Sequence, residues 1–508
     1  MKTKNLKILS LIMAVVTLLS VMIGAGTFSA LAREAYPIVY VDGIASSDIY
    51  RFNEDGSKDT IFPPTAQTIA RAIAGMPKSF LASFATSKSG KTAVGRAFVE
   101  GCKEVFADFG CDKDGNVKAN TGIDYDNTVP LLKAAVRGYY FSFDWRISPF
   151  EVAKQLNAYI KNVKEQTGSE KVNVVAFSMG GPMFLTYLKT FGYGDISSVV
   201  LHSNGCLGAS CCGLPMSGKV DLHGEYLTQY LDNILPTFDY RDLVVDLVKI
   251  LDKSYALYYT VEALEAFLMT YEQEIYEEVL VPTLASSSGV WTLCPDECFL
   301  DAKKHVFEGR EQEYKNLISI IDDYHYNVQA HAKEILDGIR ENGGNLSVVS
   351  KYNMQIIPLM TVADFQSDLV IDTRYTSLGA TCAKINESLG DDYVQKKFPE
   401  KNFISPDKVI DASTCWYPEN TWFVRDMAHS DIGNDMLDLF AFLLTSDEQP
   451  TVFDSAKYPQ FLQYDRQTRS ITPLVDSATP VYKIGSWFKV LFDFCRHLVE
   501  LVIRLVKH

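Results

Sequence analysis

The stretch Val172-Asn173-Val174-Val175-Ala176-Phe177-Ser178-Met179-Gly180-Gly181 carries the clearest structural signal in the chain. Its first six residues are mainly β-branched and apolar, which predicts a buried strand. A helix is predicted directly after Ser178, because apolar residues recur there at helical spacing: Met183, Phe184, Tyr187 and Leu188. A serine on a tight turn between a strand and a helix, with small residues two positions to either side, is typical of a nucleophile elbow. We therefore predict that Ser178 is a nucleophile.

Strands and helices alternate on both sides of this stretch. Pro37 to Val41 and Gly138 to Phe143 are rich in β-formers and predict two earlier strands, and Ser197 to Leu201 predicts a later one. Between them, a helix is predicted from Ser148, an N-cap residue followed by proline, to Gly168, a helix-ending glycine. Such alternation predicts an α/β fold with a mostly parallel sheet flanked by crossover helices.

Two insertions are expected to interrupt this core. Residues from about 45 to 135 and from 211 to 350 are dominated by helix-like periodicity, and the sheet is expected to resume at Gln355 to Val362. The second insertion is interpreted as a large helical cap over the active-site end of the sheet. The core would then comprise residues 33–210 and 351–460, followed by a turn-rich linker over 461–485.

The two termini have distinct compositions. Three lysines, an apolar run from Ile8 to Ile23 and the sequence Ala30-Leu31-Ala32 predict a cleaved signal peptide over residues 1–32. The protein is therefore expected to be exported and either secreted or associated with the cell surface. Residues 486–508 predict an amphipathic helix with a broad apolar face. That helix would dock on a protein surface or lie in a membrane interface, and the sequence leaves both open.

Composition narrows the classes of partner. The 508 residues are 47% hydrophobic and 22% charged, as in ordinary globular proteins, and the net charge of −15 argues against nucleic acid as a partner. Ten cysteines are too few for a disulfide scaffold in a chain of this length. Cys102 could pair with Cys111, and Cys382 with Cys415, but the connectivity stays open. Cys211-Cys212 together with Cys294 and Cys298 could be considered as zinc ligands. The C-x-x-x-C spacing of Cys294 and Cys298 has no matching second pair, however, so no metal site is expected.

A general base and an acid are needed to activate a serine, and in this arrangement they follow it in the order acid, then histidine. Among the later histidines, only His429 follows a strand of the resumed sheet and precedes a predicted helix. The preferred acid is Asp407, with Asp411 as the alternative. Asp364 and Asp368 lie closer to the strand predicted at 355–362 and are further candidates.

An oxyanion site requires backbone N–H groups near the nucleophile. One would come from Met179, directly after Ser178. The other would come from Ile44, in the turn Asp42-Gly43-Ile44 at the end of the first strand.

Several of these segments resemble the lecithin–cholesterol acyltransferase and phospholipase branch of the α/β hydrolases and related bacterial lipases. Phe143-Asp144-Trp145-Arg146 is similar to the family's Y-D-W-R, and Ala176 to Gly181 is similar to its A-H-S-M-G-G. The resemblance implies the α/β-hydrolase fold and aligns Asp407 and His429 with the family's catalytic aspartate and histidine. Phe177, Pro406 and Lys408 depart from the family pattern, as does Asp42.

These features together predict a serine hydrolase that cleaves carboxylic esters, with lipid acyl esters as the substrate class that the resemblance implies. No metal or organic cofactor is needed for such a reaction. The alternatives are an acyltransferase that moves a lipid acyl chain to an alcohol, a serine peptidase, and a non-catalytic lipid-binding surface protein. Residues 487–508 could add association with a membrane surface.

Overall fold

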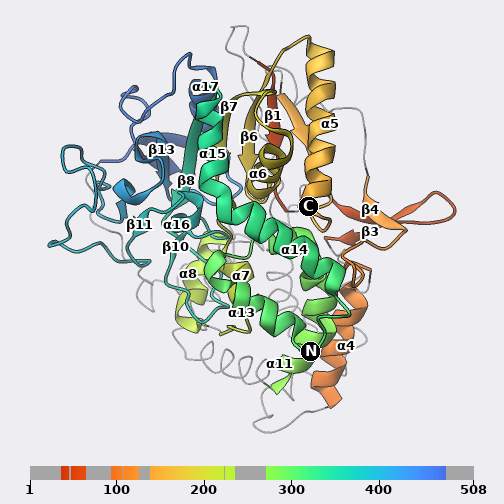
Figure 1. Ribbon diagram of the computed structural model, residues 1–508. Helices are drawn as coiled ribbons and strands as arrows, with labels where there is room; N and C mark the ends of the chain where they lie inside the picture. The colour runs from red at the N-terminus through yellow and green to blue at the C-terminus, as the bar shows by residue number, and fades with distance from the viewer. Residues whose placement is uncertain are drawn as a thin grey trace, which may run out of the picture.

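The computed structural model describes residues 36–44, 47–63, 93–106, 108–124, 138–221, 223–234 and 270–475 (Figure 1). The predicted signal peptide, residues 1–32, and the predicted amphipathic helix, residues 486–508, lie outside the described residues. Within those ranges, the helices are all too short or too polar to cross a bilayer.

An eight-stranded sheet forms the centre of the fold, with the strand order β15-β14-β13-β8-β7-β6-β1-β5. All neighbouring strands are parallel except β14 and β15, which are antiparallel. The strand β6 is buried along its whole length, as expected for a central parallel strand covered on both faces. The bounds are β1 Ile38–Val41, β5 Gly138–Phe141, β6 Val172–Phe177, β7 Ile196–His202, β8 Asn345–Tyr352, β13 Thr421–Arg425, β14 Phe461–Asp465 and β15 Ser470–Pro473.

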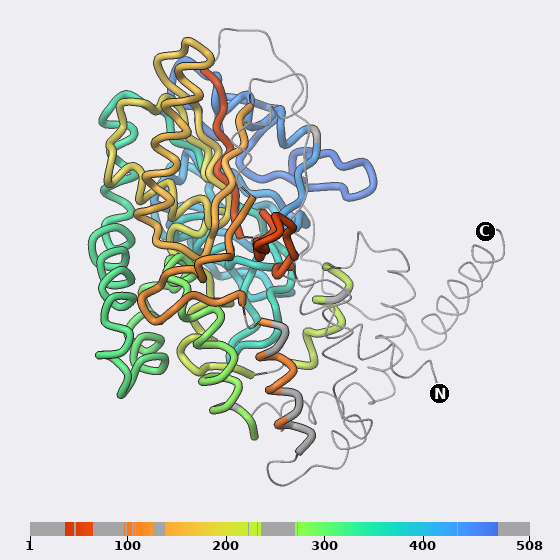
Figure 2. Tube along the Cα trace, turned by 90° about the vertical axis from the view of Figure 1, so that its right-hand side faces the viewer, coloured from red at the N-terminus to blue at the C-terminus, as the bar shows by residue number. Residues whose placement is uncertain are grey.

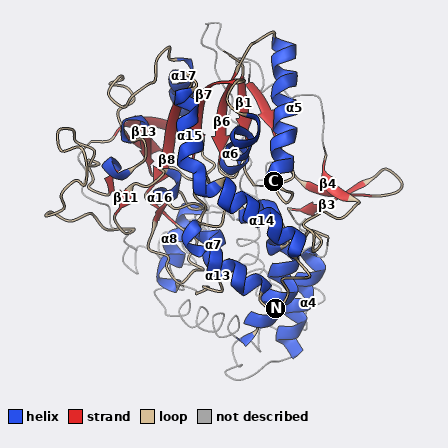
Figure 3. Cartoon of the chain, in the orientation of Figure 1, coloured by secondary structure: helices blue, strands red, loops and turns tan. Residues whose placement is uncertain are grey.

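Helices cover both faces of this sheet (Figure 3). On one face α5 (Pro149–Thr167), α6 (Gly180–Phe191) and α15 (Ala332–Glu341) pack against alternate residues of the strands, such as Val39 and Val174. On the other face α17 (Asn434–Thr445) packs against the intervening residues, such as Tyr40 and Val175. The period of two along each strand divides the apolar side chains between these two cores.

The segment between β7 and β8 is helical in its described parts. Figures 1 and 3 show most of its helices beyond one end of the sheet, whereas α15, which ends the segment, packs on the sheet itself. The first residues of the segment touch the elbow, since the Gly205 N–H donates to the Ser178 carbonyl at 2.9 Å. Its elements are α7 Ser210–Met216, α8 Gly224–Ile234, α11 Glu272–Ile275, η1 Tyr276–Ala285, α12 Ser288–Trp291, α13 Asp296–Phe307, α14 Lys315–Asn327 and η2 Gln329–His331.

The boundary between this cap and the second part of the core differs from the prediction. The core strand is β8, Asn345–Tyr352, whereas in the predicted strand 355–362 only Gln355 is in a strand, at the end of the two-residue strand β9, Met354–Gln355. β8 is hard to recognise in the sequence because it contains three polar residues, Ser347, Ser350 and Lys351. All three are buried in the structure. The apolar run that was expected to be the strand contains Pro358, which cannot donate a ladder hydrogen bond.

The first insertion also differs from the prediction. Residues 45–135 were expected to be helical, but their described parts contain a three-stranded antiparallel sheet beside α4 (Ala93–Phe106). Its strands are β2 Ile49–Phe52, β3 Lys58–Phe62 and β4 Thr121–Ile123. Trp145 joins the insertion to the core through ring contacts with Phe62 and Phe109, with centroids 5.4 and 5.3 Å apart.

The predicted linker over 461–485 begins with two strands. β14 and β15 form a hairpin that extends the main sheet, and its turn places Arg469 at a φ of 56°. Polar turn residues between the two short strands made this segment look unstructured in the sequence. Figure 2 shows the hairpin (blue) as a loop that protrudes from the sheet. The remaining described elements are small: β10 Gln366–Ser367, β11 Thr381–Cys382, β12 Ile410–Asp411, α16 Thr373–Thr376, η3 Ala412–Thr414 and η4 Pro418–Asn420.

Candidate active site

Ser178 occupies a tight turn directly between β6 and α6. Its φ is 53°, in the left-handed region that non-glycine residues rarely adopt. Backbone hydrogen bonds hold it there: its N–H donates to the His202 carbonyl at 3.2 Å, and its carbonyl accepts from Gly181 and Gly205 at 3.0 and 2.9 Å. A Cβ on Gly180 would lie 2.2 Å from the Val41 carbonyl oxygen, so this close approach of helix and strand requires glycine.

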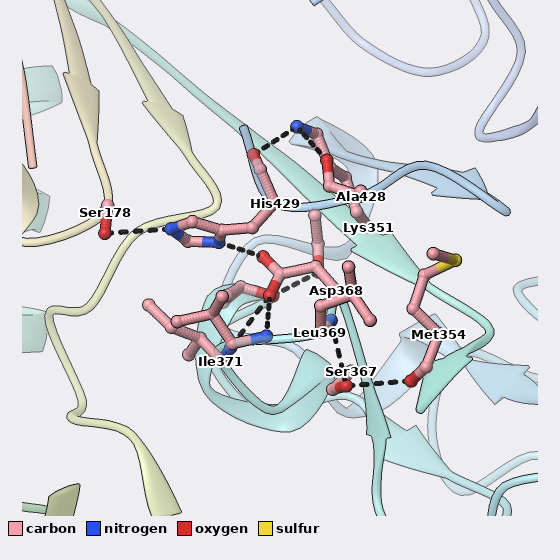
Figure 4. Close-up of polar contacts among 12 residues, drawn as sticks. Ser178, Lys351, Met354, Ser367, Asp368, Leu369, Ile371, Ala428 and His429 are labelled. Atoms are coloured by element: carbon pink, nitrogen blue, oxygen red, sulfur yellow. Dashed lines mark hydrogen bonds and ion pairs between the residues drawn. The ribbon is translucent and has the colours of Figure 1, made fainter. Parts of the chain in front are cut away.

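The structure brings the side chains of Ser178, His429 and Asp368 into one chain of polar contacts (Figure 4). The Oγ of Ser178 lies 2.9 Å from Nε2 of His429, and Nδ1 of His429 lies 2.6 Å from Oδ2 of Asp368. All three residues are buried. A serine, an imidazole and a carboxylate joined in this order have the geometry of a nucleophile with its base and an orienting acid.

Each of the three residues follows a strand of the main sheet. Ser178 comes directly after β6, Asp368 lies in the segment after β8, and His429 lies in the loop between β13 and α17. These strands are parallel, so their carboxyl ends meet at one edge of the sheet. Residues that are far apart in the sequence therefore converge at that edge.

The Asp368 carboxylate is held ionised by its surroundings. Burial alone would raise the pKa of Asp368, but the charge and hydrogen bond of His429 and the N–H group of Ile371 lower it below its usual value. The N–H groups of Val370 and Ile371 donate to Oδ1 at 3.1 and 2.8 Å, which leaves Oδ2 for the imidazole. The carboxylate therefore has a fixed orientation toward His429.

The predicted acid, Asp407, is not the residue that contacts His429. Its Oδ2 accepts from the Tyr352 hydroxyl at 2.9 Å, and its Oδ1 accepts from the Ser405 hydroxyl at 2.6 Å. Arg425 lies 3.3 Å from the same carboxylate. The buried network around Asp407 thus serves to join β8, β13 and the loop before β12.

The alternative acids also lie elsewhere. Asp411 accepts from the Tyr393 hydroxyl at 2.8 Å, and Asp364 pairs with Lys384 at 2.6 Å. Only the further candidate Asp368 reaches the imidazole. The error came from the alignment of Asp407 with the family's catalytic aspartate, since Asp364 and Asp368 both lie nearer than Asp407 to the preceding core strand in the sequence.

The predicted oxyanion turn lies against the elbow. A Cβ built on Gly43 would be 2.9 Å from Ser178 Oγ and 3.5 Å from the Met179 nitrogen. Among the described residues, the N–H groups of Ile44 and Met179 donate no hydrogen bond. Two unused N–H groups beside a buried serine can receive an anionic oxygen.

Asp42, beside this turn, carries an unusual carboxyl group. Its Oδ1 accepts from the Gly43 N–H at 2.7 Å, which shapes the turn. Burial raises the pKa of Asp42 to about 7, and the Gly43 hydrogen bond offsets only part of this effect. Asp42 is therefore protonated in part near neutral pH.

Phe177, which departs from the family pattern, packs between two histidines. Its ring centroid lies 4.8 Å from that of His429 and 5.0 Å from that of His202. Among the described residues, neither ring nitrogen of His202 has a hydrogen-bond partner. Burial, followed by the charges of Lys351 and His429, holds the pKa of His202 well below its usual value. His202 is therefore neutral and acts as an apolar packing group.

The described cysteines are unbridged, including Cys102, Cys111, Cys382 and Cys415. The described part of the chain contains no group of three or more histidine, cysteine or acidic side chains arranged to hold a metal ion. Cys211-Cys212, Cys294 and Cys298 thus form no such group.

The comparison with protein-family models agrees with this topology. Residues 136–277 match the family model described as alpha/beta hydrolase fold. The crystal structure of the Tle4–Tli4 complex is similar at 14% identity and a TM-score of 0.25, covering 63% of this chain and 75% of that one. No curated protein sequence matches this chain. The family match and the mostly parallel eight-stranded sheet flanked by helices show that the chain has the α/β-hydrolase fold.

Proposed function

We propose that this protein is a serine ester hydrolase that cleaves carboxylic esters, with lipid acyl esters as its substrate class, through an acyl-enzyme on Ser178. The observation that carries the proposal is the contact chain from Ser178 through His429 to Asp368, at 2.9 and 2.6 Å. The left-handed backbone of Ser178 supports it as well, because strained backbone is concentrated at functional sites.

The reaction takes place in two steps. Ser178 Oγ attacks the ester carbonyl carbon while its proton passes to Nε2 of His429, and the imidazolium then protonates the departing alcohol as the C–O bond breaks. A water molecule attacks the acyl-enzyme in the same way and releases the carboxylic acid. Asp368 holds the Nδ1–H of His429 and stabilises the imidazolium, a role that its low pKa supports.

The negative oxygen of each tetrahedral intermediate is proposed to lie between the N–H groups of Ile44 and Met179. Their position beside Ser178 supports this assignment. Stabilisation by such donors contributes about 3 to 4 kcal/mol per donor in enzymes of this type.

Apolar residues beside the catalytic groups support an acyl substrate. Leu369 follows Asp368, Ala428 precedes His429, and both belong to one buried apolar cluster with Tyr230 of α8. Apolar residues directly next to the acid and the base favour a hydrocarbon chain over a charged group beside the reacting ester. The resemblance to the acyltransferase and phospholipase branch favours a lipid in particular.

Two substitutions of buried serines test the proposal. Ser178→Ala should abolish labelling by a fluorophosphonate probe and hydrolysis of p-nitrophenyl butyrate, because the nucleophile is lost. Ser203→Ala is the matched control: Ser203 is also buried, has a φ of 44° and directly follows the neighbouring strand β7. A Ser178→Ala variant that hydrolyses the ester at the wild-type rate would refute the proposal. A series of p-nitrophenyl esters of rising chain length then tests the lipid assignment, which requires kcat/KM to increase with chain length.

Export is proposed together with this function, on the sequence of residues 1–32 alone. Expression of the whole chain in a secreting bacterial host should yield a product in the medium or at the cell surface that begins at Arg33. N-terminal sequencing checks the cleavage site, and an intact Met1 on a cytoplasmic product would argue against export.

A further inference from the structure

We propose that Lys351 is a positioning residue for His429, acting through the main chain of the loop that carries this histidine. The inference rests on the proposed function, since it assigns Lys351 a part in the same Ser178–His429–Asp368 site. Neither the sequence patterns nor the family match points to this lysine.

The Lys351 side chain is fully buried in the central part of the sheet. It lies on β8, the strand between β7 and β13, and its exposed fraction is 0%. A lysine is almost never fully buried unless its charge is satisfied. Its position therefore requires partners for the ammonium group.

Those partners are three main-chain carbonyls of the histidine loop. Nζ donates to the carbonyl oxygens of Ala428 at 3.0 Å, His429 at 2.6 Å and Asp431 at 2.9 Å. Figure 4 shows Lys351 beside the loop, with contacts to Ala428 and His429. The carbonyl of His429 itself is one of the acceptors, so the ammonium fixes the backbone from which the imidazole projects.

The number of donors matches the number of acceptors. An ammonium group has three N–H bonds, and all three are used here. A neutral amine has only two N–H bonds, and its lone pair would face a carbonyl oxygen. The anchoring of the loop therefore depends on the charged form of Lys351.

Several titratable groups face this ammonium. Asp368 and the side chain of Asp431 stabilise its charge, and the charge of Lys351 in turn helps to keep His202 on β7 neutral. Lys351 in turn helps to lower the pKa of Asp368, so the buried lysine and the buried carboxylate support each other's charge next to His429. Burial lowers the pKa of Lys351 to about 8. Loss of its proton therefore falls within the range of ordinary assays.

Displacement of the loop would act directly on catalysis. The Ser178–His429 contact of 2.9 Å spans two separate segments, and Lys351 ties the part of the histidine segment that includes His429 to β8. Misplacement of a catalytic group by about 1 Å can lower a rate by about 100-fold. Such a change lowers kcat and leaves KM for a small ester nearly unaltered.

The experiment compares Lys351→Met, which keeps the length of the side chain without its charge, with Lys303→Met as the control. Lys303 is a half-buried lysine in α13 that pairs with Asp322 at 2.6 Å. For p-nitrophenyl butyrate at pH 7.0, Lys351→Met should lower kcat about 100-fold, change KM less than threefold, and slow fluorophosphonate labelling of Ser178 by a similar factor. Lys303→Met should behave as the wild type. A folded Lys351→Met variant with kcat within twofold of the wild type would overturn the inference.

The wild-type pH profile provides a test that does not depend on folding of the variant. Between pH 7.0 and 9.5, kcat should fall with an apparent pKa near that of Lys351, about 8, while the near-UV circular dichroism stays constant. If Lys351→Met does not fold, a flat kcat profile over this range would overturn the inference. Wild-type protein that is neither labelled at Ser178 nor active would refute the proposed function itself. Normal labelling of both wild type and Lys351→Met would refute only the role of Lys351.

Discussion

The carboxylate of Asp368 lies 2.6 Å from Nδ1 of His429, whereas that of Asp407 is engaged by Tyr352, Ser405 and Arg425. Both carboxylates are buried and both lie between β8 and β13 in the sequence. Packing alone separates an acid that can orient the imidazole from one that stabilises the neighbouring strands. This division has consequences for variants of each residue.

Substitution of the two aspartates should produce different defects. Asp368→Asn should lower kcat by about 10⁴-fold, because an amide no longer holds the imidazole in the required tautomer. Asp407→Asn should keep most of kcat and lower the free energy of unfolding by about 3 kcal/mol, because Arg425 loses its buried counter-charge. Steady-state kinetics and thermal unfolding of the two variants check this. If Asp407→Asn lost kcat and Asp368→Asn kept it, Asp407 would be the acid.

A methyl group at Gly43 should disturb the nucleophile. In Gly43→Ala the new Cβ would lie 2.7 Å from the Ser178 Cβ and 2.9 Å from its Oγ, so the serine or the oxyanion turn must move. We expect kcat/KM for p-nitrophenyl butyrate to fall by about 100-fold. Gly194→Ala is the control, since its Cβ would meet nothing within 4 Å. Equal activity of the two variants would remove the turn at Gly43 from the site.

The stability of the protein should depend on pH through Asp42. Burial raises the pKa of Asp42 to about 7, so the folded state retains a proton that the unfolded state releases near pH 4. The stabilising contribution of the protonated carboxyl is complete below the unfolded pKa and is lost as pH rises to about 7.

Asp42→Asn removes this dependence, because the amide is neutral at every pH and can still accept from Gly43. Relative to the wild type, the variant should gain about 3 kcal/mol of unfolding free energy between pH 4.5 and pH 8. Urea unfolding at the two pH values measures the gain, with the exposed Asp59→Asn as the control. If the difference in unfolding free energy between Asp42→Asn and the wild type were the same at pH 4.5 and pH 8, ionisation of Asp42 would not destabilise the folded state.

Arg146 should tie the first insertion to the core. Its guanidinium is fully buried, forms bonds of 2.9 and 2.7 Å with the two carboxylate oxygens of Asp144, and donates to the Phe109 carbonyl at 2.9 Å. Arg146→Met leaves the Asp144 carboxylate buried without its counter-charge, so we expect a loss of about 3 to 5 kcal/mol in unfolding free energy.

The same variant should become sensitive to limited proteolysis within residues 108–124, the segment that Arg146 contacts through Phe109. Arg340→Met is a suitable comparison, because Arg340 is half-buried and contacts Asn420 on the opposite part of the core. Cleavage of both variants at the same rate and at the same sites would argue against a specific anchoring role for Arg146.

Features that depend only on neighbouring residues could be predicted from the sequence. The β-run before Ser178 and the helical pattern after it are local, and they correctly predicted the strand, the turn and the helix of the elbow. The alternation of strands and helices likewise predicted the α/β-hydrolase fold that the sheet order and family match show. His429 could be selected because few histidines follow a strand, and the structure does bring it to Ser178.

The acid that contacts His429 and the lysine that binds the carbonyls of its loop could be identified only from contacts between distant segments. Asp364, Asp368, Asp407 and Asp411 all lie between two strands, and sequence order cannot rank them, because the loop that bears them folds back on itself through long-range hydrogen bonds. β8 itself was obscured, since the buried Ser347, Ser350 and Lys351 resemble surface residues until their partners are known. A buried polar side chain is stabilised by contacts with distant segments, so its place in the fold cannot be derived from local pattern alone.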